Sequence, residues 1–207
     1  MKINRKRLNN KGFTLIELLA VVVILAVVMG IAMTSVLSSM NNSRKGSLQN
    51  SAKKVSQTIQ TKYSEALVTN SVADVYGDVL KSDATNKNGF DFSAPGVVLY
   101  TLPDGLKDDM NLSPSTYLLD TATKPTPITV TTDASGNKTA TATNSFVGFD
   151  GSKVIVCLFA KQGGSYYVGD ATKTAGTVDF AEVKITMETA SGAADMWACS
   201  TDNTQSW

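Results

Sequence analysis

The sequence contains no histidine, and it has none of the short patterns that usually mark a catalytic or metal site. The absence of histidine removes the commonest general base and the commonest metal ligand. The two cysteines form no Cys-x-x-Cys pair, no nucleophile motif accompanies the serines and lysines, and no aspartates have the Asp-x-Asp spacing of a calcium loop. We therefore expect no enzyme, no catalytic residue, no metal and no cofactor.

Acidic residues are absent from the N-terminal segment. Residues 1–12 hold five of the 19 basic residues and none of the 18 acidic ones, so the chain without this segment is mildly acidic. Contacts with nucleic-acid phosphates depend on clustered Lys and Arg. We therefore do not expect nucleic acid as a partner.

A long apolar segment follows directly. Residues 13–33, FTLIELLAVVVILAVVMGIAM, carry no charged side chain except Glu17. As a helix with a rise of about 1.5 Å per residue the segment would extend roughly 31 Å, which matches the hydrocarbon core of a bilayer. The segment is therefore predicted to cross a membrane, and a carboxylate at that depth needs either a partner or a function.

The charges around the apolar segment predict its orientation. All the charges of residues 1–12 are positive, which by the positive-inside rule keeps the N-terminus in the cytoplasm and sends the rest of the chain outward. No Ala-x-Ala site follows the apolar segment, as it would in an ordinary secretory signal. Instead Gly12 precedes it, so processing there would leave the apolar helix on the mature protein. An uncleaved signal anchor is the simpler alternative.

Residues 11–19, KGFTLIELL, resemble the class III signal of type IV pilins and pseudopilins. The shared features are a short basic leader, glycine before the cut, phenylalanine after it, and glutamate as the fifth residue of the mature chain. The resemblance covers some 20 residues. It implies cleavage after Gly12 by a membrane-embedded prepilin peptidase, and N-methylation of the new terminal amine on Phe13. Many pilins have a proline about 22 residues into the mature chain, whereas this sequence has Thr34 there and no proline before Pro95.

Cleavage after Gly12 suggests a role for Glu17. The new positive amine on Phe13 would lie at membrane depth, where a charge becomes tolerable only when it is paired. Phe13 and Glu17 are four residues apart, close enough for a contact within one helix. The family resemblance favours a pair between the Glu17 carboxylate of one subunit and the Phe13 amine of its neighbour, so that both residues act in subunit assembly.

The hydrophobic period continues beyond the membrane segment. Apolar residues recur at intervals of three and four and predict an amphipathic helix over residues 34–68. Residues 69–96 contain turn formers and no sustained period, so they are predicted to form a connecting loop. The members of the apolar stripe are Val36, Leu37, Met40, Leu48, Ala52, Val55, Ile59, Tyr63, Ala66 and Leu67.

Residues 97–207 have the pattern of a β-sheet domain. Short β-branched or aromatic segments alternate with Gly, Asn, Asp and Pro, and residues 133–137 and 150–152 are typical of hairpin turns. We predict an α+β protein in which the long N-terminal helix packs on an antiparallel β-sheet head, as in the pilin fold. The predicted strands are 97–102, 116–120, 127–132, 138–143, 145–149, 153–160, 165–169 and 177–188.

The two cysteines are Cys157, in the most apolar predicted strand, and Cys199, near the C-terminal end. The predicted topology places both outside the cytoplasm, where disulfides persist. Pilins often fix a C-terminal region with such a bridge, so the resemblance favours a Cys157–Cys199 disulfide. Two buried free thiols are the alternative.

Three classes of function remain open. The resemblance implies a structural subunit of a type IV pilus, which would serve adhesion, surface motility or aggregation. The first alternative is a pseudopilin of a type II secretion or competence DNA-uptake filament, and the second is an uncleaved signal-anchored surface protein. The size of the predicted sheet domain favours a pilin over a small competence pseudopilin.

The resemblance also implies partners and a location. The expected partners are identical or related pilin subunits in a helical homopolymer, the prepilin peptidase, the pilus assembly machinery and the membrane before assembly. Host or cell surfaces are further candidates. We expect a single-pass protein of the cytoplasmic (inner) membrane before assembly and an extracellular pilus afterwards. The Pro-poor composition, with many Asn and Lys residues, favours a Gram-positive host.

Overall fold

A computed structural model describes residues 13–77, 89–161, 163–164, 166, 175–188 and 197–201. The chain divides into two compact units, residues 1–42 and 43–207. One α-helix, α1 (Leu15–Thr69), begins in the first unit and ends in the second. We call residues 15–42 the anchor half of α1, residues 43–69 its head half, and the second unit the head.

The head half of α1 is amphipathic. Its apolar stripe faces the interior of the head, and polar side chains cover the rest of its surface. The stripe members before Leu48 belong to the anchor half and are exposed; Leu37 and Met40, for example, are 52% and 45% accessible. Burial therefore begins at Leu48. The buried residues of α1 are Leu48, Ala52, Val55, Ile59 and Ala66.

Four antiparallel strands form the inner sheet of the head, in the order β1-β4-β5-β8. The predicted α+β class, a long helix with an antiparallel sheet, is confirmed. A tight turn at residues 150–152 joins β4 and β5, as predicted. The strands are β1 (Val98–Thr101), β4 (Phe146–Phe149), β5 (Val154–Phe159) and β8 (Trp197–Cys199).

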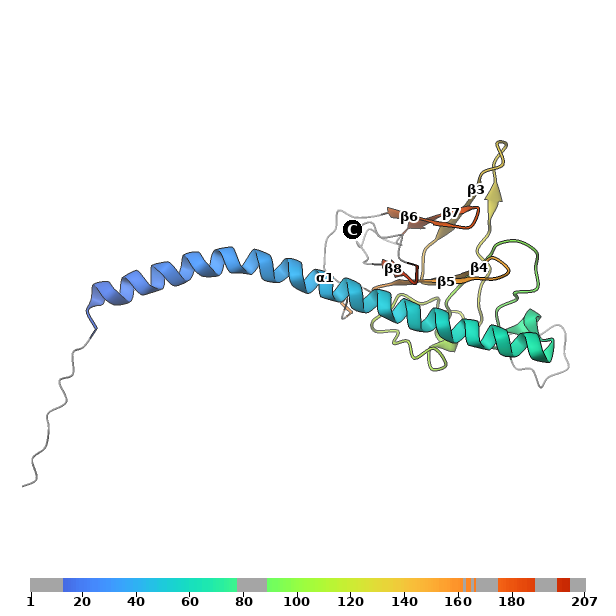
Figure 1. Ribbon diagram of the computed structural model, residues 1–207, viewed down its shortest axis with the longest axis horizontal. Helices are drawn as coiled ribbons and strands as arrows, with labels where there is room; N and C mark the ends of the chain where they lie inside the picture. Colours follow the sequence, from blue (N-terminus) through green and yellow to red (C-terminus); the bar gives the residue numbers. More distant parts are fainter. Residues whose placement is uncertain are drawn as a thin grey trace, which may run out of the picture. The chain divides into compact units, whose positions relative to one another are not determined.

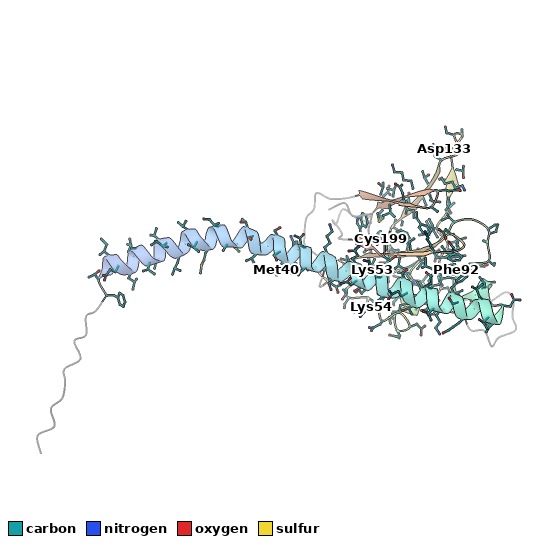
Figure 2. All side chains as sticks on the ribbon, in the orientation of Figure 1. Met40, Lys53, Lys54, Phe92, Asp133 and Cys199 are labelled. Carbon is teal, nitrogen blue, oxygen red and sulfur yellow. A yellow bond between two sulfur atoms is a disulfide. The ribbon has the colours of Figure 1, made fainter. Side chains whose placement is uncertain are left out.

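A second four-stranded sheet, the outer sheet, has the order β2-β3-β7-β6. Its pairs β2–β3 and β6–β7 are antiparallel, whereas β3 and β7 run parallel, a pairing that the sequence did not predict. Asp133 lies at the tip of the β2–β3 hairpin, where residues 133–137 form the predicted turn (Figure 2). The strands are β2 (Thr131–Thr132), β3 (Lys138–Ala142), β6 (Ala175–Phe180) and β7 (Val183–Glu188).

The inner sheet is buried on both faces because it lies between α1 and the outer sheet (Figure 1). Side chains alternate along a strand, so every residue of β5 is buried in one of two cores. Val154, Val156 and Leu158 pack with α1 in the helix core. Ile155, Cys157 and Phe159 pack with the outer sheet in the sheet core. The head is therefore a three-layer structure.

Polar contacts fix the head half of α1 to the inner sheet. Ser56 donates its hydroxyl to the carbonyl of Val154 at 2.9 Å, and the side-chain amide of Gln60 donates to the carbonyl of Ser152 at 3.1 Å. Both contacts reach the start of β5 and the turn before it. Because hydrogen bonds are directional, these contacts set the position of the helix along the sheet. The apolar packing of the helix core is non-directional and does not set this position alone.

Two predicted strands are not continuous strands. In residues 116–120, Leu118 donates its N–H to Phe159 and Asp120 donates to Leu102, so the segment divides its bonds between two neighbours. In residues 127–132 only β2 is a strand, because Pro127 has no N–H to donate and makes just an isolated bridge to Tyr100.

The C-terminal part of the head differs from the prediction in two further places. The predicted strand 177–188 is two strands, β6 and β7, joined by a turn at Ala181 with a φ of 51°. Strand β8 was not predicted. The predicted strand 165–169 lies outside the described residues apart from Tyr166, whose hydroxyl is 3.2 Å from that of Ser47.

Within the described part of the predicted connecting loop, the residues just after α1 bond to residues 89 and 90. A 3-10 turn, η1 (Val72–Asp74), follows α1. Val75 and Phe90 form an isolated antiparallel bridge, and the Asp74 carboxylate accepts the N–H of Gly89 at 2.8 Å. A second 3-10 turn, η2 (Asp104–Leu106), follows β1.

Candidate functional site

Thr14 and Glu17 form a reciprocal pair at the start of α1. The helix begins at Leu15, so Thr14 is its N-cap and Glu17 its third residue. The backbone N–H and the hydroxyl of Thr14 both donate to Glu17 Oε2, each at 2.8 Å. In return, the Glu17 N–H donates to Thr14 Oγ1 at 3.3 Å. This arrangement is a capping box, which satisfies two N–H groups that the first turn of a helix leaves without partners.

Phe13 directly precedes the capping box. Its side chain is 89% exposed. Gly12, the other residue of the predicted cleavage site, lies outside the described residues. Within residues 13–77, Glu17 Oε1 accepts no hydrogen bond, because both bonds to the carboxylate end on Oε2. The site therefore has one carboxylate oxygen held by its own chain and a second oxygen available to another donor.

The anchor half of α1 presents apolar side chains on all sides (Figure 2). Every Leu, Ile, Val and Met from Leu15 to Leu37 is more than half exposed. This helix is long and apolar enough to cross a membrane. A helix that is apolar all round is stable only when lipid or other protein surrounds it.

The two cysteines meet in the sheet core. Cys157 of β5 and Cys199 of β8 are directly opposite each other in the antiparallel register, and a disulfide joins them. Their Cα atoms are 4.0 Å apart, and neither side chain is more than 1% exposed. The bond fixes β8, an edge strand of only three residues, to the centre of the inner sheet.

Two grooves on the described part of the head are lined by a mixture of apolar, polar and charged side chains. The larger, about 650 Å³, lies between α1 and residues 109–112, and the smaller, about 470 Å³, lies beside Tyr76. Burial, followed by the charges of Asp109 and Glu65, raises the pKa of Tyr76 to about 12, so its phenol stays protonated near neutral pH. Among the described residues, no three Cys, Asp or Glu side chains are grouped to hold a metal ion.

The structure thus places the predicted site residues in two groups. Phe13 and Glu17 lie at the start of α1, and Cys157 and Cys199 lie in the sheet core. Thr14 was not predicted as the partner of Glu17. The signal was present, because Thr-x-x-Glu directly before an apolar helix is the sequence pattern of a capping box.

Residues 7–33 match one protein-family model, which is described as the prokaryotic N-terminal methylation motif. The match contains the predicted cleavage site, the capping box and most of the apolar segment. No curated protein and no solved structure matches the chain. The similarity to a known family is therefore confined to the N-terminal segment, and it does not extend to the head.

Proposed function

We propose that this chain is a structural subunit of a type IV pilus. The premise is that the matched motif is the class III signal of type IV pilins, which supports a pilin-like or pseudopilin protein. The subunit is cleaved after Gly12, N-methylated on Phe13 and polymerised through the anchor half of α1. That family is structural and generally non-enzymatic.

The exposure of the anchor half is the observation that carries the proposal. Eighteen large apolar side chains between Phe13 and Met40 are at least 45% exposed, while the head buries its own apolar residues in two cores. Lipid covers this surface in the newly inserted subunit, and the same half-helices of other subunits cover it in a filament. Both environments are apolar, so transfer between them leaves the apolar surface covered throughout.

Glu17 is the only charged side chain of residues 13–33, and its charge must be compensated in both environments. In the filament, the carboxylate of Glu17 pairs with the methylated amine on Phe13 of a neighbouring subunit. Removing one partner from a buried ion pair costs about 3–5 kcal/mol, because the other charge is left without compensation. The pair therefore acts as a check of register as each subunit leaves the membrane.

The proposal includes the topology and the partners of the subunit. The basic leader stays in the cytoplasm, where prepilin peptidase removes it, and the head folds on the outer side, where the disulfide persists. The assembly machinery then transfers the subunit from the cytoplasmic membrane to an extracellular filament. Adhesion, surface motility and aggregation are the activities that such a filament serves.

A pseudopilin of a secretion or DNA-uptake filament is the second candidate. It has the same N-terminal chemistry, so the anchor half does not discriminate between the two. The size of the head favours a pilin, because two four-stranded sheets provide an extensive outer surface. A plain signal anchor is the third candidate, and it explains neither the Gly12–Phe13 junction nor Glu17.

Intact-mass measurement of filaments sheared from cells tests the proposal. The expected mass is that of the chain from Phe13 onward plus one methyl group. Gly12→Val should leave the precursor uncleaved in the membrane, because a side chain at this position clashes in the groove of the peptidase. Filaments built from full-length Gly12→Val protein would refute the processing step.

The assembly role of Glu17 has a separate test. Glu17→Ala should be cleaved, inserted and folded normally and yet fail to form filaments alone, and Glu17→Gln should be nearly as defective because it lacks the charge. Polymerisation of Glu17→Ala at the wild-type level would show that the carboxylate is not the assembly residue.

A further inference from the structure

We infer that Thr14 is a positioning residue for Glu17: it holds one carboxylate oxygen on its own helix and leaves the other oxygen for the amine of a second subunit. This inference rests on the proposed function, because it assigns a partner to the residue through which subunits are proposed to assemble. Its evidence is the hydrogen bonding at the start of α1.

The bonds between Thr14 and Glu17 are unequal in length. The two bonds that Thr14 donates to the carboxylate are 2.8 Å long, whereas the bond that it accepts from the Glu17 N–H is 3.3 Å long. Hydrogen bonds to an ionised acceptor are shorter and stronger than those between neutral groups. The contact therefore holds the Glu17 side chain in place at least as much as it caps the helix.

Both donated bonds end on the same oxygen, Oε2. An ionised carboxylate accepts through two oxygens, so Oε1 keeps its capacity for an ammonium donor. A free glutamate side chain would lose rotamer freedom when it met that donor. Because Thr14 has already fixed the side chain, a smaller part of this cost falls on the assembly step.

The same contact also suits the subunit before assembly. An isolated carboxylate in hydrocarbon is costly, and the N–H and hydroxyl of Thr14 give Glu17 two donors without a second subunit. One pair of residues thus serves both stages: Thr14 satisfies part of the carboxylate in lipid, and the remaining oxygen stays available for the neighbour.

The test is a competition for incorporation into filaments. A tagged variant is co-expressed with the untagged wild-type chain, and the tagged-to-untagged ratio in sheared filaments is divided by the same ratio among cleaved subunits in the membrane. Thr14→Val removes the hydroxyl but keeps the branched shape. We expect its incorporation to fall roughly tenfold, as for the loss of a hydrogen bond to a charged group. Thr14→Ser keeps the hydroxyl and should incorporate like the wild type.

Thr14→Gly separates positioning from simple helix capping. Glycine is an acceptable N-cap that costs only a few tenths of a kcal/mol relative to threonine, but it has no hydroxyl to donate. If Thr14 positions Glu17, Thr14→Gly should be as defective as Thr14→Val. Incorporation of Thr14→Gly at the wild-type level would show that only capping matters, and would overturn the inference.

The remaining outcomes are equally decisive. Normal incorporation of Thr14→Val, poor incorporation of Thr14→Ser, or failure of the Thr14 variants to be cleaved would each overturn the inference. Glu17→Ala is measured in the same assay. Its normal incorporation would refute the proposed function itself, whereas its exclusion together with normal incorporation of the Thr14 variants would refute the role of Thr14 alone.

Discussion

The two halves of α1 share one helical backbone but have opposite surfaces. The anchor half buries no side chain in its own chain, and the head half buries an apolar stripe from Leu48 to Ala66. An apolar surface all round suits a solvent of lipid or of other helices, whereas a single stripe suits one sheet. The contrast is that the head half contributes to a hydrophobic core, whereas no residue of the anchor half belongs to one.

The largest expected effect comes from removing one ring of the helix core. Phe149 is 1% exposed, and its ring centroid is 4.5 Å from that of Phe92. Phe149→Ala should lower the free energy of unfolding of the head by about 3–5 kcal/mol, because it leaves a cavity. Denaturant titration in detergent, followed by the fluorescence of buried Trp197, measures this change.

Val23→Ala is the matched control in the anchor half. Val23 is 54% exposed, so the substitution should leave the unfolding of the head unchanged. A similar loss of stability in both variants would break the comparison, because it would mean that the anchor half contributes to the folding of the head.

The disulfide provides the second test. The two cysteines are 42 residues apart in the sequence, and cross-linking a loop of this length stabilises a fold by about 2–4 kcal/mol. The double variant Cys157→Ala/Cys199→Ala should lose that amount in the head while it inserts into the membrane as the wild type does. Thiol labelling of the unfolded, unreduced wild type should detect no free thiol, and detection of two would refute the bridge.

A pair of glycines sharpens the comparison on a smaller scale. A Cβ built on Gly148 lies 2.8 Å from Ile155 Cγ2 and 2.9 Å from Leu99 Cδ2 in the sheet core, whereas one on Gly46 of the head half meets nothing within 4 Å. Gly148→Ala should cost about 1–3 kcal/mol by overpacking. Gly46→Ala should stabilise the helix by up to about 1 kcal/mol. Two thermal unfolding curves that shift in the same direction would contradict this prediction.

The smallest expected effect is a loss of head stability in acid. Burial raises the pKa of Asp150, but the N–H groups of Lys153 and Ser152 donate to its carboxylate and hold the pKa below the ordinary value of an aspartate. A lowered pKa gives stability that is fully present above the unfolded-state pKa, about 3.9, and is lost as the pH falls through the folded-state pKa. Denaturant titrations from neutral pH down to pH values below the pKa of a free aspartate should show this loss of stability. Asp150→Asn should make the free energy of unfolding less dependent on pH over the same range.

Much of the fold could be predicted because its signals are local. The apolar stripe of the head half repeats every three or four residues, so helix periodicity alone placed the end of α1 at about residue 68, and the structure ends it at Thr69. The most apolar predicted strand, 153–160, is β5 in the structure, and every residue of β5 is buried. These patterns depend on neighbours in sequence, which the sequence displays directly.

The structure differs from the prediction where contacts between residues far apart in the sequence determine the fold. No Gly, Pro or Asn marks the turn between β6 and β7, where Ala181 has a positive φ that is uncommon for a residue with a side chain. The parallel pairing of β3 with β7 depends on which strands meet in space, and strand composition does not encode that choice. β8 has only three residues, and the disulfide and the register with β5 hold it in the sheet.

The sequence predicts the residues of the N-terminal site but not its geometry. Gly12, Phe13 and Glu17 are predicted from a pattern that is contiguous in sequence, from Lys11 to Leu19, and their roles are part of the proposed function. Glu17 was predicted to have a charged partner, whereas its partner within the chain is Thr14, whose hydroxyl and N–H are neutral donors three residues away. A residue that positions another through neutral hydrogen bonds is easily missed when only charges are paired.

The place of β8 in the chain makes the completion of both cores depend on a late segment. Ala198 belongs to the helix core, and Trp197 and Cys199 belong to the sheet core, so both cores are complete only when residues 197–199 are in place. Under the proposed function, in which the head folds on the outer side of the membrane, this step would come late in export. A subunit whose synthesis stopped before β8 would then present the open edge of β5 to extracytoplasmic proteases.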